Sequence, residues 1–367
     1  MARPRVSAAT FARTDVAESA NPGATLVAPV HAIDGERLAA GLAAHVAPFA
    51  GPLDVRQFQG GQSNPTYRIA AGERQYILRR KPPGKLLPSA HAVDREYRVM
   101  KALADTDVPV PRMVALCEDE SVVGTAFYLM DYVRGRVLWD PTLPGMTPAQ
   151  RAAHYDELNR VIAALHRVDF TAVGLADFGR HGQYVERQVA RWSKQYAAAG
   201  IDPIPAMDRL IEWLPRHLPG DDETTIVHGD YRLDNVIFHP TQPRVLAVLD
   251  WELSTLGHPL SDFAYQVMAW RLTPAQFRGL GGCDLAALGI PSEADYVAAY
   301  CRRTGRSGIA HFEYYLIFNM FRIAAILHGV LARAVHGNAA SQDAADTGSR
   351  ARVVADVAWG MAQQLER

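Results

Sequence analysis

Cysteine is scarce in this sequence, and its scarcity argues against two classes of protein. The chain has 367 residues but only three cysteines, Cys117, Cys283 and Cys301, and they lie far apart. An odd, scattered set fits neither the disulfide framework of a small secreted domain nor the paired spacing of a zinc module. We therefore expect reduced thiols and a cytoplasmic location.

Long apolar runs and an excess of one charge are lacking as well. No segment reaches the roughly 18 consecutive apolar residues of a membrane span. The 38 Lys and Arg residues balance 39 Asp and Glu residues, which gives a formal net charge of -1. The global charge therefore favours neither nucleic acid nor an anionic membrane as a partner, and we expect neither.

The composition of the chain changes along its length, and the changes predict two lobes. Residues 1–30 are rich in Ala, Pro, Ser and Gly and predict a surface tail. Residues 31–133 combine short β-branched runs with one amphipathic helix over 91–105, whereas residues 134–367 are mostly helical in period. We predict an α+β fold with a small antiparallel β-rich N-terminal lobe and a larger helical C-terminal lobe.

A polar cluster lies within the helical part. The stretch "HGDYRLDN" contains Asp230 and Asn235, and Asp250 follows the apolar run "VLAVL" twenty residues after Asp230. Magnesium prefers a few hard oxygen ligands from protein together with substrate phosphates, which suits Asn235 and Asp250. Asp230 then remains to orient a hydroxyl and accept its proton, the division of labour that phosphoryl transfer requires.

Other functions remain open for this cluster. A metal-dependent hydrolase would use His228, Asp230, Asp250 and His258, but it gives the small lobe no purpose. A catalytically silent nucleotide-binding module is the second alternative. Arg232 is either a solvated loop residue or a contact to a phosphate or an acidic substrate.

The cluster resembles a known family. "HGDYRLDN" is similar to the H-G-D-x-x-x-x-N catalytic loop of the aminoglycoside phosphotransferases and choline kinases, and "LDWE" resembles their metal-binding segment. The resemblance implies a protein-kinase-like bilobal fold, ATP or GTP as phosphate donor, Mg²⁺, and a small hydroxylated substrate. It also implies that Asp262 in "GHPLSDFAY" braces the catalytic loop, and we expect His228 to support the same loop by hydrogen bonds.

The small lobe supplies candidate phosphate contacts. The stretch "QGGQSNPTYRI" lies between two predicted strands and contains Gly60, Gly61, Ser63 and Asn64. Backbone N–H groups in a glycine turn can approach phosphate closely, because glycine has no Cβ. We predict that these four residues contact the nucleotide.

The cation of the small lobe is an arginine where the family has lysine. Strand alternation places Ile77 and Arg79 on one face, and we expect this face to line the nucleotide site. Arg80 and Lys81 remain alternatives for the phosphate contact. Glu96, seventeen residues after Arg79 and within the predicted helix, is the expected acidic partner of that cation.

The stretch "FYLMDYVRG" is similar to the hinge between the lobes of such kinases. The resemblance implies that the backbones of Asp131 and Val133 bond the adenine edge and that Met130 lies beside it.

The substrate is less determined than the chemistry. "ILRRKPPGKLLPSAHAVDREYRV" resembles the kinase-like domains joined to acyl-CoA dehydrogenases, which implies a hydroxyacyl compound or another hydroxylated metabolite. Cationic aminoglycosides favour an acidic pocket, and the helical C-terminal third has no concentrated run of Asp and Glu. The sequence is compatible with a homodimer.

Overall fold

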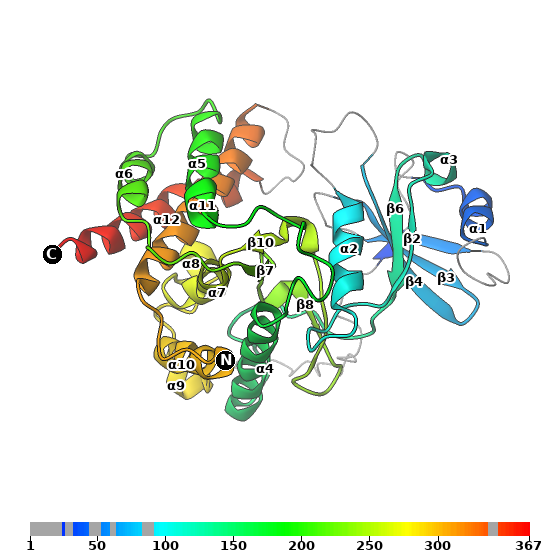
Figure 1. Ribbon diagram of the computed structural model, residues 1–367, viewed down its shortest axis with the longest axis horizontal. Helices are drawn as coiled ribbons and strands as arrows, with labels where there is room; N and C mark the ends of the chain where they lie inside the picture. The colour runs from blue at the N-terminus through cyan, green and yellow to red at the C-terminus, as the bar shows by residue number, and fades with distance from the viewer. Residues whose placement is uncertain (1–23, 26–31, 44–52, 59–63, 83–91, 337–343) are drawn as a thin grey trace, which may run out of the picture.

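A six-stranded sheet forms the core of the N-terminal lobe (Figure 1). The computed structural model describes residues 24–25, 32–43, 53–58, 64–82, 92–336 and 344–367. The elements of this lobe are β1 (Ala24–Thr25), α1 (Gly35–Ala43), β2 (Asp54–Phe58), β3 (Thr66–Ala71), β4 (Arg74–Arg80), α2 (Val93–Leu103), β5 (Met113–Cys117), α3 (Glu120–Val123) and β6 (Phe127–Asp131). The strand order is β1-β2-β3-β4-β6-β5, and every neighbouring pair is antiparallel.

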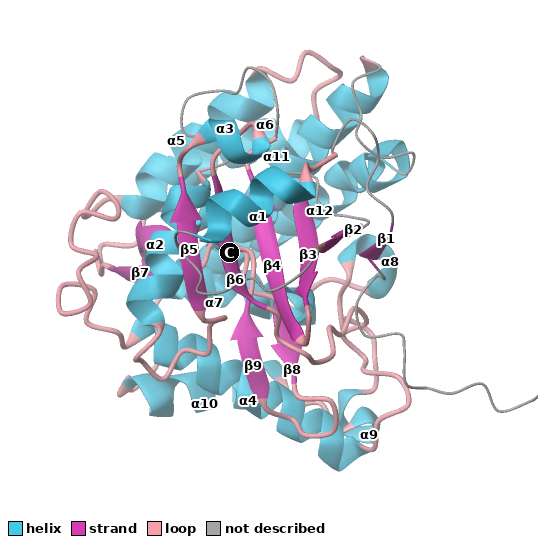
Figure 2. Cartoon of the chain, turned by 90° about the vertical axis from the view of Figure 1, so that its right-hand side faces the viewer, coloured by secondary structure: helices cyan, strands magenta, loops and turns pink. Residues whose placement is uncertain are grey.

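The two faces of the sheet pack against different partners, as the alternation of β4 requires. Tyr76 and Leu78 join a small core with α1 on the outer face, where Figure 2 shows that helix lying across the strands. Ile77 belongs instead to the main core, with α2 and the C-terminal lobe. Arg79 therefore faces the junction between the lobes.

Helices make up most of the C-terminal lobe. Its helices are α4 (Pro148–His166), α5 (Tyr184–Ala197), α6 (Pro205–Trp213), α7 (Pro259–Val267), α8 (Pro274–Phe277), α9 (Leu285–Leu288), α10 (Glu293–Thr304), α11 (Phe312–Val335) and α12 (Ala344–Leu365). Its strands are β7 (Thr225–Val227), β8 (Val236–Phe238), β9 (Val245–Val248) and β10 (Thr255–Gly257), paired as β7 with β10 and β8 with β9. The arrangement confirms the predicted α+β fold with a small β-rich lobe and a larger helical one.

Helix α11 runs through the centre of this lobe. Its most apolar window, with a mean hydropathy of 1.6, is long and apolar enough to cross a membrane, but 78% of that window is buried inside the protein. Packing against α12, α7 and α5 accounts for this apolar character.

Short loops between the strands carry the polar cluster predicted from the sequence. Gly229 adopts a φ of 84°, where an added Cβ would lie 2.9 Å from the Leu253 carbonyl oxygen. Only glycine takes this conformation and this approach without strain, so the loop after β7 can lie against the loop after β9.

The link between the lobes is held against β8. The backbones of Arg136 and Phe238 exchange two hydrogen bonds of 2.8 Å. A Cβ on the preceding Gly135 would lie 2.3 Å from both Ile237 Cγ2 and the Phe238 carbonyl oxygen. The connection can therefore approach β8 this closely only with glycine at position 135.

We expect Gly135→Ala to lower the free energy of unfolding by about 1–3 kcal/mol, because the backbone must shift to relieve the overpacking. Gly360→Ala in α12 is the matched control, since nothing lies within 4 Å of its added Cβ. The control should gain about 0.5–1 kcal/mol from the lower conformational freedom of alanine. Denaturant unfolding of both variants measures the difference, and equal effects would contradict the close approach.

Candidate active site

The catalytic loop is held by a buried carboxylate. The backbone N–H groups of His228 and Gly229 donate to Asp262 at 2.7 and 2.8 Å, and His166 Nε2 lies 3.2 Å from the same carboxylate. Asp262 lies in the first turn of α7, which begins at Pro259. Burial alone would raise the pKa of Asp262, but His166 and the donated hydrogen bonds hold that pKa below its ordinary value.

His228 joins the catalytic loop to the segment before Asp250. Its buried ring has Nε2 within 2.8 Å of the Leu249 carbonyl oxygen, and Nδ1 accepts the Asp230 backbone N–H at 3.2 Å. This pairing places the proton on Nε2 and the lone pair on Nδ1. Both nitrogens are thereby engaged with backbone groups, which suits a supporting residue and not a metal ligand.

The carboxylate of Asp230 has three neighbouring donors. Tyr265 donates its hydroxyl to Oδ1, and the Asn235 amide nitrogen donates to Oδ2 at 2.9 Å and to the Asp230 carbonyl oxygen at 2.8 Å. Arg232 Nε lies 3.3 Å from Oδ2. Because its amide nitrogen serves Asp230, Asn235 has its amide oxygen left to bind a cation.

Asp250 adopts an uncommon backbone conformation. Its φ of 65° and ψ of 57° lie in the left-handed region, which asparagine and aspartate enter more readily than other non-glycine residues. Oδ1 accepts Arg79 Nη2 at 2.8 Å, and the side chain is 33% exposed. Such local strain is typical of functional sites.

The donor set at this site fits magnesium. Asn235 and Asp250 offer one amide oxygen and one carboxylate, and substrate phosphates and water supply the other ligands that Mg²⁺ takes. Within the described part of the chain, no three His, Cys, Asp or Glu side chains lie where they could hold a metal. His258 lies instead beside Asp221 and Tyr315, which argues against the hydrolase alternative.

Arg79 connects the two lobes. Its guanidinium pairs with Glu96 through Nε at 3.1 Å and with Asp250 and Glu252 through Nη2 at 2.8 and 3.2 Å. Burial alone would lower the pKa of Arg79, but the surrounding carboxylates raise it, so the guanidinium is charged.

The neighbouring basic residues are placed differently. Arg80 is buried on the other face and donates to the Val123 carbonyl oxygen at 2.7 Å. Lys81 Nζ lies 3.9 Å from Asp94 Oδ1 near the surface. Of the three basic residues at the end of β4, Arg79 is thus the one that meets Glu96.

Glu96 is fixed by two further side chains. The Asn64 amide donates to Oε1 at 2.8 Å and the Tyr128 hydroxyl donates to Oε2 at 3.0 Å. The Asn64 side chain thus holds the acidic partner of Arg79, and its predicted phosphate contact stays a prediction. The other predicted residues of this turn, Gly60, Gly61 and Ser63, lie outside the described residues.

A cavity extends from the hinge to Arg79 and Asp250. Four residues predicted to contact the nucleotide base line it: Ile77, Met130, Asp131 and Val133.

Backbone groups remain available at the edge of this cavity. The N–H of Asp131 donates to Arg112 at 2.9 Å and that of Tyr132 to Gln75 at 3.1 Å. The Val133 N–H donates to no backbone oxygen of the described residues. Among the described residues, this N–H therefore has no backbone acceptor to compete with a ligand.

A second cavity lies next to the residues that contact Asp230. Its walls include Arg232 and Tyr265, both of which contact the Asp230 carboxylate. Its remaining lining is mostly aromatic and apolar: Trp139, Pro141, Tyr155, Leu158, Leu233, Met268, Ala269, Trp270, Leu272 and Phe277, with Asp234, Gln266 and Arg278 as the other polar residues.

Sequence reasoning did not assign two residues that hold the site. Tyr265 orients Asp230, and burial together with the Asp230 charge raises the pKa of its hydroxyl. Arg322, on α11, donates to the Gly229 carbonyl oxygen at 2.5 Å and lies over the ring of Tyr265. The position of Tyr265 inside "GHPLSDFAY" was a usable signal, whereas nothing local marks Arg322.

Comparisons with known proteins identify the family of the chain. The model of the phosphotransferase enzyme family matches residues 54–305. A crystal structure of a candidate aminoglycoside phosphotransferase from Ralstonia eutropha is 56% identical, with a TM-score of 0.84, and the match covers 91% of this chain and 99% of that one. A spectinomycin phosphotransferase in complex with ADP and spectinomycin has a TM-score of 0.61 at 12% identity, over 90% of this chain and 99% of its own, which shows the fold alone.

Curated relatives extend the comparison. The mouse acyl-CoA dehydrogenase family member 10 is 51% identical over 85% of this chain, and the human family member 11 is 42% identical over 88%. The chain spans only 29% and 43% of the lengths of these two relatives. Together the matches show that the chain belongs to the phosphotransferase enzyme family.

Proposed function

We propose that the protein transfers the γ-phosphate of ATP, with Mg²⁺, to a hydroxyl group of a small molecule. One observation carries this proposal: Asp250 and Arg79 line the inner end of the hinge cavity, and the residue before Asp250 is hydrogen-bonded to the catalytic loop. The Leu249 N–H donates to the Asn235 carbonyl oxygen at 2.8 Å, and the Asn235 amide in turn donates to Asp230. A phosphoryl transfer site needs this combination of a base, cation ligands and a phosphate-neutralising charge.

Each side chain has a distinct task in this mechanism. Asp230 accepts the hydrogen bond of the acceptor hydroxyl and takes its proton, while Tyr265 and Asn235 keep the carboxylate in place. Asn235 and Asp250 would hold the Mg²⁺, which when bound neutralises the charge of the donor phosphates. Arg79, anchored by Glu96, offers its charge to the same phosphates.

The hinge favours ATP over GTP. The Val133 N–H, which has no backbone acceptor in the described part of the chain, can donate to N1 of adenine. The Asp131 carbonyl can accept from the adenine amino group. Guanine has a donor, N1–H, where adenine has the acceptor N1, and an acceptor, O6, where adenine has its amino group. The same two hinge groups would therefore oppose guanine.

The lining of the second cavity favours an acceptor substrate that has an apolar part and carries no positive charge. Its single lining carboxylate, Asp234, already pairs with Arg232 and Arg278. A polycationic aminoglycoside would find no free carboxylate among the described lining residues, whereas an acyl chain would meet aromatic walls. We therefore propose a hydroxyacyl compound or a similar hydroxylated metabolite as substrate, and we place the reaction in the cytoplasm.

The acceptor class is tested by ATP consumption over a panel of hydroxyacyl-CoAs, free hydroxy acids and aminoglycosides. We expect turnover, with a phosphorylated product detected by mass spectrometry, from members of the first two groups. Nucleotide binding without turnover of any compound would favour the silent module, and turnover of aminoglycosides alone would contradict the proposed substrate class.

The division of labour between two aspartates gives a sharper test. Asp230→Ala should reduce kcat by about 10²-fold or more, as expected for loss of a general base, while Mg·ATP affinity stays nearly unchanged. Asp250→Ala should weaken Mg·ATP binding because it removes a cation ligand. Calorimetric titration of both variants measures the affinities, and Asp346→Ala, at an exposed residue of α12, is the control. An equal loss of nucleotide affinity in the first two variants would contradict the assigned roles.

The rim of the second cavity offers a test of acceptor binding. Trp139 lines this cavity and is 55% exposed, so Trp139→Ala should leave the melting temperature nearly unchanged. We expect a rise of about tenfold in KM for the acceptor, the equivalent of about 1.4 kcal/mol of lost apolar contact. Leu365→Ala, at a similarly exposed residue (51%) near the end of α12, is the control. Steady-state kinetics that give the same KM for both variants would show that the acceptor binds elsewhere.

A further inference from the structure

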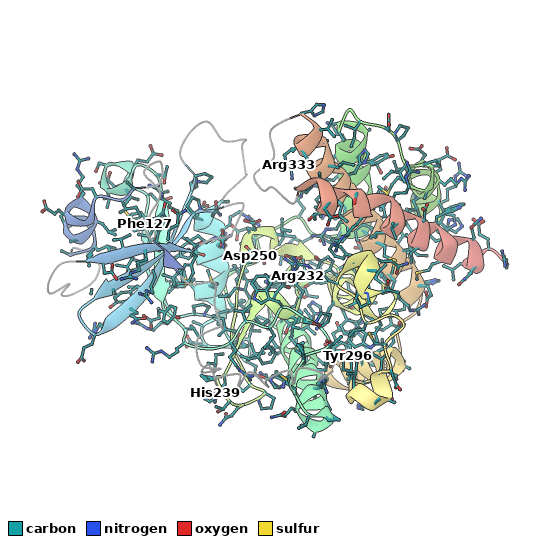
Figure 3. The ribbon with its side chains drawn as sticks, turned by 180° about the vertical axis from the view of Figure 1, so that it is seen from behind. Phe127, Arg232, His239, Asp250, Tyr296 and Arg333 are labelled. Carbon is teal, nitrogen blue, oxygen red and sulfur yellow. The ribbon has the colours of Figure 1, made fainter. Side chains whose placement is uncertain are left out.

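Arg232 has no task in the mechanism above. Among the ion pairs of the described residues, however, it is the basic residue that pairs with the catalytic carboxylate of Asp230. Its Nε lies 3.3 Å from both Asp230 Oδ2 and Asp234 Oδ1, and its side chain is 33% exposed. Figure 3 shows Arg232 and Asp250 together near the junction of the lobes. Within the described residues Arg232 makes its ion pairs through Nε, which leaves both Nη groups to donate to a ligand.

Two further residues hold the Arg232 guanidinium in place. Asp234 is only 7% exposed, and its second oxygen accepts Arg278 Nη1 at 2.7 Å. Two arginines thus share one carboxylate, so Asp234 does not cancel the charge that Arg232 brings to Asp230. A solvated loop arginine would need neither a buried carboxylate nor a second arginine to hold it.

A cation beside the Asp230 carboxylate also lies beside the place where the phosphoryl group is transferred. The transferred phosphoryl group carries negative charge on its equatorial oxygens and must come next to Asp230, because the attacking hydroxyl bonds to both. The flat fork of a guanidinium matches two such oxygens.

We propose that Arg232 is a further catalytic residue that donates through its Nη groups to the phosphoryl group in transfer. Asp234 and Arg278 are positioning residues for it. In the reaction the acceptor oxygen forms a bond to the γ-phosphorus, the bond to ADP breaks with its electron pair on ADP, and the hydroxyl proton passes to Asp230. Arg232 moves no proton and supplies charge only. The proposal rests on the proposed function.

The test uses two nucleotide probes that need no acceptor. Mg·ADP with aluminium fluoride mimics the planar phosphoryl group in transfer, and Mg·AMP-PNP mimics the ground state. For Arg232→Ala we expect a loss of about 10²-fold in affinity for the first probe and about the same loss in the rate of ATP hydrolysis by water. AMP-PNP affinity should change by less than about threefold, since ground-state contacts are kept.

Further variants separate this role from a structural one. Arg232→Lys should recover about tenfold of the loss because it restores the charge without the fork geometry. Asp234→Asn should give an intermediate loss with the same probe selectivity. Arg244→Ala, at an exposed arginine in the turn before β9, is the matched control and should behave like the parent.

Three results would overturn the proposal. One is that Arg232→Ala changes the affinity for the aluminium fluoride probe and the affinity for AMP-PNP by the same factor relative to the parent. Another is a rise in acceptor KM alone, which would assign Arg232 to an anionic group of the substrate. The third is a lower melting temperature with unchanged kcat in both Arg232 variants. Failure of the proposed function is distinguishable, because then the parent itself binds neither probe in the presence of Mg²⁺.

Discussion

The rest of the site depends on the buried charge of Arg79. One guanidinium meets Glu96 from the N-terminal lobe and Asp250 and Glu252 from the C-terminal lobe. Removing one partner of such a cluster typically costs about 3–5 kcal/mol, because the remaining charge is left buried and uncompensated. A lysine ammonium has no comparable fork with which to reach both lobes at once. The arginine at this position thus fixes the base of the nucleotide cavity as well as providing charge for phosphate.

The elements and the central motif could be predicted from the sequence because their signals are local. Alternation in β4 assigned Ile77 and Arg79 to one face, and the structure places both along the hinge cavity. Asp230, Asn235 and Asp250 lie within short loops between apolar strands, so their convergence follows once the strands pair. The spacing from Arg79 to Glu96 likewise follows from one strand and one helix.

Contacts between distant segments could not be predicted in the same way. Arg322 reaches the catalytic loop from a helix 93 residues further along the chain, and its contact depends on how α11 packs. The hydrogen bond from the Asn64 side chain to Glu96, across 32 residues, likewise has no local signal. The walls of the second cavity come from five or more separate segments, so its aromatic character is invisible to a reading along the chain.

In the proposed mechanism, Asn235 and Asp250 make nucleotide binding depend on magnesium. Thermal unfolding of the parent protein with ATP, in the presence of Mg²⁺ or of a chelator, tests this most directly. At a ligand concentration of about one hundred times Kd, bound Mg·ATP should stabilise the fold by about 2.7 kcal/mol. We expect this stabilisation with Mg²⁺ and its loss with the chelator. Equal stabilisation in both conditions, or none in either, would contradict it.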